Sequence, residues 1–177
     1  ISPQGKHNSS QELKETLQIL KSTNGFVTAC NFPARYEFLR KRYTELPYYD
    51  LSSCKSLNDF VNSFQRNHLS LVFASPFYSD LSSTFGHVLL AFHKEPELDL
   101  NSDIIQFAAV TNNEPFFNYA YKGIFGGFDA HFMRDPFFRK YHEYAIEQQR
   151  YIHVYTLDTK YDDIIFLLYH LFELRKA

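Results

Sequence analysis

Three polar residues stand where reactive side chains could meet. Cys30 lies three residues before Pro33, a favoured first residue of a helix. The N-terminal end of a helix dipole favours a thiolate and lowers the pKa of a cysteine. His87 lies in an apolar run, 85–92, and Gln106 lies in the next such run, 103–110. These residues predict a Cys–His acyl-transfer site in which Cys30 attacks, His87 moves the proton and Gln106 orients the imidazole.

His87 has a second interpretation that the pattern leaves open. Alternate residues of a strand share a face, so His87 lies on an apolar face together with Phe85 and Leu89. A single histidine in such a place is commonly a core residue whose ring is satisfied by hydrogen bonds. The order of cysteine, histidine and amide along the chain is that of papain-like and NlpC-type cysteine enzymes, which is the reason to consider catalysis.

Glycines form the next signal. Half of the six glycines lie in "KGIFGG", at 122–127. Backbone without Cβ atoms lets a ligand approach closely, so we expect this segment to form one wall of the cleft beside Cys30 and His87. Tyr121 and Lys122 would lie at its rim. The alternative is a tight turn in which a glycine supplies a positive φ.

The composition excludes several classes of function. The 177 residues carry a formal net charge of −2 with no long basic block, which argues against nucleic acid as a partner. The histidines show no metal-binding spacing, and we expect no cofactor and no metal. No apolar run reaches the roughly 18 residues of a membrane span, and residues 1–12 are too polar for a signal peptide. Two cysteines are too few for a disulfide scaffold, but one bridge or two free thiols both remain open.

The periodicity predicts one domain, 1–177, of the α+β class. Helices are expected over 9–23, from Pro33 to Pro47, and over 56–66. In the first of them Ser9 and Glu12 have capping-box spacing, and Gly25 ends the helix. Strands are expected over 69–74, 85–92, 103–110 and 150–157, an irregular aromatic segment over 111–149, and a last helix over 160–174. The helical part thus covers about 9–67 and the sheet-rich part about 69–157. Helices first and sequential strands later predict an antiparallel sheet with helices packed on one face.

The assembled motifs resemble the N-terminal periplasmic domain of the Lnb-type lipoprotein N-acyltransferases, a bacterial exported family. The matching stretches are "CNFPARYEFL" (30–39), "LVFASPFYSDLSSTFGHVLL" (71–90), "IIQFAA" (104–109), "AYKGIFGGF" (120–128) and "RKYHEYAIEQQRYIHVYTL" (139–157). The resemblance implies a papain-like fold and Cys–His acyl transfer on a lipid or lipoprotein at the membrane surface. Within the matched stretches we expect the substrate to contact Arg35, Ser83, Tyr121, Lys122, Gly126 and Gly127.

The sequence departs from the family's pattern in two respects. Ala91 and Phe92 stand where members often carry an Arg, and Gln106 stands where the strand usually has Asn. Full-length acyltransferases also carry transmembrane helices after this domain. The chain has none, so we expect an excised domain or a soluble relative.

Two hypotheses of different classes follow. In the first, the chain is an exported, periplasmic, cysteine-dependent acyltransferase or hydrolase domain whose catalytic residues are Cys30, His87 and Gln106. In the second, it is a non-catalytic exported binding module. There Cys30 and Cys54 form a disulfide, as an oxidising compartment favours, and the aromatic segment 111–138 is the recognition surface.

Overall fold

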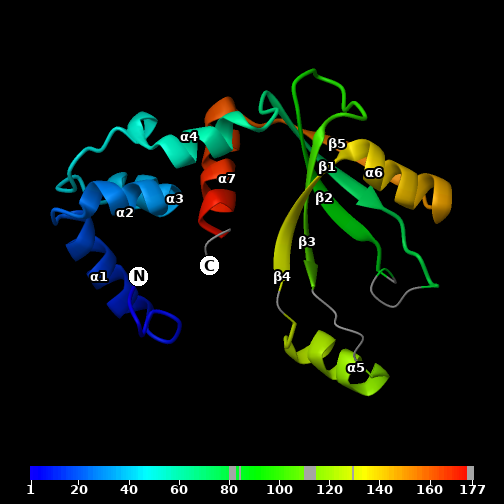
Figure 1. The fold of residues 1–177 in the computed structure, drawn as a ribbon, viewed down its shortest axis with the longest axis horizontal. Coiled ribbons are helices and arrows are strands. Elements are labelled where there is room, and N and C mark those ends of the chain that lie inside the picture. Colours follow the sequence, from blue (N-terminus) through cyan, green and yellow to red (C-terminus); the bar gives the residue numbers. More distant parts are fainter. Residues whose placement is uncertain (80–82, 84, 110–114, 129, 175–177) are drawn as a thin grey trace. The chain divides into compact units, whose positions relative to one another are not determined.

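The elements follow the chain in the order drawn in Figure 1. The computed structural model describes residues 1–79, 83, 85–109, 115–128 and 130–174. Contacts gather into two compact units: residues 1–63 with the stretch from 165 onward, and residues 64–164. That the whole chain is one domain stays a prediction. The described elements are α1 (Ser9–Leu20), α2 (Gly25–Asn31), α3 (Pro33–Arg40), the 3-10 turn η1 (Leu51–Ser53), α4 (Lys55–Asn62), β1 (His68–Ala74), β2 (His87–His93), β3 (Asp103–Ala109), α5 (Phe116–Phe125), β4 (Ala130–Pro136), α6 (Phe137–Tyr141), the π-helix η3 (His142–Glu147), β5 (Ile152–Leu157) and α7 (Tyr161–Leu174).

The first unit consists of helices, and two of its predicted boundaries are wrong. The N-cap of α1 is Asn8, whose side chain accepts the Gln11 amide at 3.0 Å, and not Ser9; the Glu12 carboxylate accepts the Ser2 amide instead. Gly25 does not end α1 but begins α2. A Cβ at Gly25 would collide with the Leu20 carbonyl and the Tyr49 hydroxyl, so this glycine permits a close approach.

Apolar stripes at helical spacing form the core of the first unit. Tyr36, Leu39 and Leu57 are buried, as are Leu168 and Leu171 of the last helix. The Tyr36 hydroxyl donates to the Pro47 carbonyl and accepts the Tyr49 amide, which pins the segment after α3.

The second unit is built on a five-stranded antiparallel sheet of order β4-β3-β2-β1-β5. In the register Val72 lies opposite Leu89, and Leu90 lies opposite Ile105. Short apolar runs rich in β-branched and aromatic residues make β1, β2, β3 and β5, as the sequence predicts, whereas β4 lies in the segment predicted to be irregular. The α+β class with an antiparallel sheet is confirmed.

One face of the sheet carries the core of the second unit. Val72, Ala74, Leu89, Ala91 and Ile104 are buried on it under Phe137 of α6 and Tyr144 of η3. The helical cover comes from the region predicted to be irregular. Residues 115–128 and 130–149 instead form α5, β4, α6 and η3, while positions 111–114 and 129 lie outside the described residues.

Candidate functional site

A glycine turn places His87 at the start of β2. Gly86 has a φ of +87°, and its amide donates to the Ser83 carbonyl at 3.0 Å. A Cβ at this position would lie 2.7 Å from the Phe73 ring and 2.8 Å from the Ala74 carbonyl, so only glycine fits without displacement. His87 follows directly and pairs with Ala74, the last residue of β1.

The imidazole of His87 is half-buried on the core face, where Gln106 of β3 also lies. Burial, reinforced by the positive charges of Lys140 and Arg150, lowers the pKa of His87 below its ordinary value; a hydrogen bond with Gln106 and the charge of Glu143 act in the opposite direction. The Nε2 atom is buried and has no hydrogen-bond partner within the described part of the chain. A neutral imidazole with an unpaired nitrogen is the form that accepts a proton.

The π-helix η3 supplies the wall against this ring. The Tyr144 ring centroid lies 6.1 Å from that of His87. Burial, with a smaller effect of Glu143, raises the pKa of Tyr144 to about 12, so its hydroxyl stays protonated. Lys140 forms an ion pair of 2.8 Å with Glu143. The charge around His87 is therefore set by side chains from one short helical stretch and from Arg150.

Cys30 is oxidised. It forms a disulfide with Cys54, with the two Cα atoms 5.5 Å apart, and neither cysteine is free. The helix predicted to begin at Pro33 does begin there, but Cys30 lies in the last turn of the preceding helix, α2. The bridge predicted by the binding-module hypothesis is thus present, and Cys30 has no thiol while it is closed.

Comparison with known families decides what the chain is. Residues 56–177 match the family described as the Lnb N-terminal periplasmic domain. The chain belongs to this family. Its domain is periplasmic, where an oxidising environment sustains a disulfide. Residues 1–42 match a second family, a domain of unknown function (DUF7843). No curated protein and no solved structure matches the chain.

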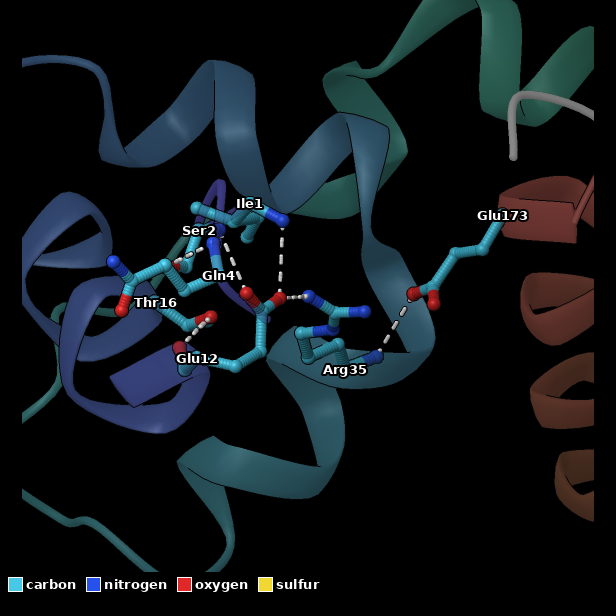
Figure 2. A network of polar contacts seen from close by, with 7 residues as sticks. All are labelled: Ile1, Ser2, Gln4, Glu12, Thr16, Arg35 and Glu173. Atoms are coloured by element: carbon cyan, nitrogen blue, oxygen red, sulfur yellow. Dashed lines mark hydrogen bonds and ion pairs between the residues drawn. The ribbon is translucent and has the colours of Figure 1, made fainter. Parts of the chain in front are cut away.

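Arg35, expected at the substrate, is held in a polar network of the first unit (Figure 2). Its guanidinium pairs with Glu12, which also accepts the Ser2 amide and the N-terminal ammonium group of Ile1. Burial alone would raise the pKa of Glu12, but these donors together hold it below its ordinary value. The Arg35 amide donates to Glu173 at 2.9 Å, so a carboxylate of α7 caps the start of α3, where Phe32 provides no capping side chain.

The glycine segment is largely helical. Gly123 lies inside α5, and Gly126 ends that helix in the left-handed conformation with a φ of +76°. The amides of Gly126 and Gly127 both donate to the Lys122 carbonyl, at 2.9 and 2.8 Å, which is a helix C-cap. Tyr121 is exposed, and its ring lies 4.7 Å from that of Phe125. The placement of this segment as a wall of the cleft stays a prediction.

The structure therefore brings together His87 and Gln106, with the Ser83 carbonyl fixing the turn before His87. Cys30 and Arg35 belong to the first unit. Sequence patterns did not single out Tyr144, Lys140 or Arg150. The only signal for them is their place in the stretch "RKYHEYAIEQQRYIH", which matches the family but contains no catalytic pattern.

A hollow of about 520 Å³ is lined by residues of α6 and η3 together with Leu100. None of the residues predicted to act at the site lines it; its lining is Leu100, Phe138, Arg139, Tyr141, His142 and Ile146. Among the described residues, no three His, Cys, Asp or Glu side chains gather as a metal site requires. No described helix is long and apolar enough to cross a membrane.

Proposed function

We propose that this periplasmic domain supplies the acid–base group of an acyl-transferring or hydrolysing site that acts on a lipid or lipoprotein, and that His87 is this group. One observation carries the proposal: a half-buried imidazole, kept neutral by its surroundings, has a buried Nε2 with no partner in the described structure. Buried polar atoms are normally paired, so an unpaired one at a titratable ring suggests a group that is paired during the reaction.

The proposed chemistry is proton transfer at Nε2. The ring takes the proton from the attacking group as that group bonds to the acyl carbon, and then donates it to the departing group as the acyl bond breaks. Gln106 would hold the ring orientation through its hydrogen bond. Cys30 can attack only after the bridge to Cys54 has been reduced, because a disulfide sulfur is not a thiolate nucleophile.

The test is a pair of histidine variants in the complete protein, assayed for acyl transfer from a diacylated lipopeptide. We expect His87→Ala to lose about 10²- to 10⁴-fold in rate, the usual contribution of a general acid–base group. His153→Ala is the matched control, because His153 is an exposed histidine in β5 of the same sheet. Full activity in His87→Ala would refute the proposal.

The disulfide favours a second candidate, the non-catalytic binding module. If Cys30 is purely structural, the double variant Cys30→Ala/Cys54→Ala should keep whatever acyl transfer the wild type shows. Loss of activity in the double variant without loss of fold, together with activation of the wild type by reductant, would instead assign the nucleophile to Cys30. Absence of acyl transfer in the wild type under both conditions would contradict the catalytic proposal and is the result expected of a binding module.

A further inference from the structure

An irregular backbone precedes β5. The π-helix η3 closes with the Gln148 amide donating to the Glu143 carbonyl at 3.1 Å. Gln149 then takes a φ of +53°, a left-handed conformation that residues other than glycine rarely adopt. π-Helices and left-handed residues are both enriched at functional sites, where the surrounding structure compensates their cost. The consequence here is that the next residue, Arg150, turns back, and its amide donates to the Tyr144 carbonyl at 2.8 Å.

Arg150 is 5% exposed, and its guanidinium reaches the end of β1. Its Nε donates to the Ser75 carbonyl at 2.6 Å, and its Nη2 donates to the Ala74 carbonyl at 3.0 Å. Ala74 is the residue that pairs with His87. A planar guanidinium presents its donors to the two successive carbonyls in a fixed geometry, which an ammonium group on a flexible stem does not.

The same guanidinium stacks on the wall of the site. Its Cζ lies 4.6 Å from the centroid of the Tyr144 ring, and the Tyr144 ring lies 6.1 Å from the His87 ring. Lys140 approaches the Tyr144 ring to 5.6 Å. Arg150 is therefore joined to His87 along two routes, one through the backbone of β1 and one through the Tyr144 ring.

We propose that Arg150 is a positioning residue for His87, which fixes the strand end opposite the imidazole and holds Tyr144 against it. The inference rests on the proposed role of His87. Among the described residues, the charged and titratable groups that act on the imidazole are Arg150, Lys140 and Glu143, with Tyr144 protonated and Gln106 as a polar neighbour. Arg150 and Lys140 oppose the imidazolium and Glu143 favours it, so removing Arg150 removes both a packed wall and a positive charge. Both losses shift the imidazole toward protonation.

The experiment follows the imidazole protons of His87 by NMR across a pH titration of the full chain, with the resonance assigned by its disappearance in His87→Gln. Arg150→Met removes both the positive charge and the hydrogen bonds to the Ser75 and Ala74 carbonyls. Arg139→Met is the matched control, because the Arg139 side chain of α6 is 66% exposed and pairs with Asp135 of β4. We expect the His87 titration to move to higher pH in Arg150→Met and to stay at the wild-type position in Arg139→Met.

A structural role alone would lower the melting temperature of Arg150→Met and leave the His87 titration unchanged, and that result would overturn the inference. If Arg150→Met does not fold, Arg150→Lys replaces it. Lysine keeps the positive charge but not the planar pair of hydrogen bonds to the two carbonyls. The His87 titration should therefore move to higher pH by less than in Arg150→Met. An unchanged His87 titration would again overturn the inference.

The pH profile of the complete enzyme adds an independent reading. In Arg150→Met the acid limb of kcat/KM should move to higher pH, while a purely structural defect lowers kcat/KM equally at every pH. Full activity in His87→Ala would refute the proposed function but would not affect the titration result for Arg150→Met. An unchanged titration would sink only the role of Arg150.

Discussion

Removal of the Cys30–Cys54 bridge should destabilise the first unit by about 3.5 kcal/mol. The two cysteines are 24 residues apart in the sequence, and the chain-entropy relation for a loop of that length gives this figure at 25 °C. The perturbation is Cys30→Ala/Cys54→Ala, which leaves no unpaired thiol. Cys54 is buried, so the loss of its sulfur from the core adds to the cost.

The assay is urea unfolding followed by far-UV circular dichroism, to which the helices of the first unit contribute strongly. With a typical slope of about 1–3 kcal/mol per molar urea, the midpoint of that transition should fall by about 1.2–3.5 M. The wild type in dithiothreitol is the matched control: it keeps both sulfurs, and its midpoint should approach that of the double variant. The double variant itself should not respond to the reductant.

Coincident midpoints for the oxidised wild type and the double variant would refute this reasoning. A thiol count on the native protein checks the premise directly, because the bridge predicts no reactive thiol before reduction and two after it.

The remaining predictions concern stability. Burial lowers the pKa of His87 in the folded protein below its ordinary value of about 6.5. The folded state should therefore be fully stable above about pH 6.5 with respect to this group and should lose stability as the pH falls from about 6.5 through the pKa of the folded state. Thermal melts of His87→Gln should lack this pH dependence. Gly86→Ala should cost about 1–3 kcal/mol in urea unfolding, since its φ of +87° and the nearby Phe73 ring leave no place for a Cβ; wild-type stability would contradict this. Glu173→Ala should cost about 0.5–2 kcal/mol by uncapping the Arg35 amide, and an unchanged midpoint would show that water replaces the cap.

Much of the second unit could be predicted because short apolar runs bounded by turn residues have few alternatives to strands. The alternation of residues along a strand also predicts that His87 lies on the apolar face, and Gln106 lies on that same face. The stretch 111–149 could not be predicted in this way, because a π-helix has no propensity signature and because aromatic residues suit helices, strands and turns alike.

The candidate site, too, could be predicted only in part from the sequence. The identity of His87 follows from its local setting, but Tyr144 reaches it from a π-helix and Arg150 follows a left-handed residue at Gln149, and no sequence rule predicts either feature. Cys30 shows the opposite failure. Its distance from Pro33 predicted the right helix, but a further short helix, α2, lies in front of that helix and contains the cysteine.

The strand order indicates when the candidate site forms during folding. Neighbouring strands pair along β1, β2, β3 and β4 in chain order, but β5 returns to lie beside β1, with Ile152 opposite Ala74. Pairing across that separation closes the longest loop in the sheet, so we expect β5 to dock last and its amides to exchange earliest in native-state hydrogen exchange. Arg150 stands just before β5. A chain that is still crossing into the periplasm can thus form the strand that carries His87 before Tyr144 and Arg150, which come later in the chain and set the environment of the imidazole, are in place. The site is completed only after nearly all of the second unit has entered the periplasm.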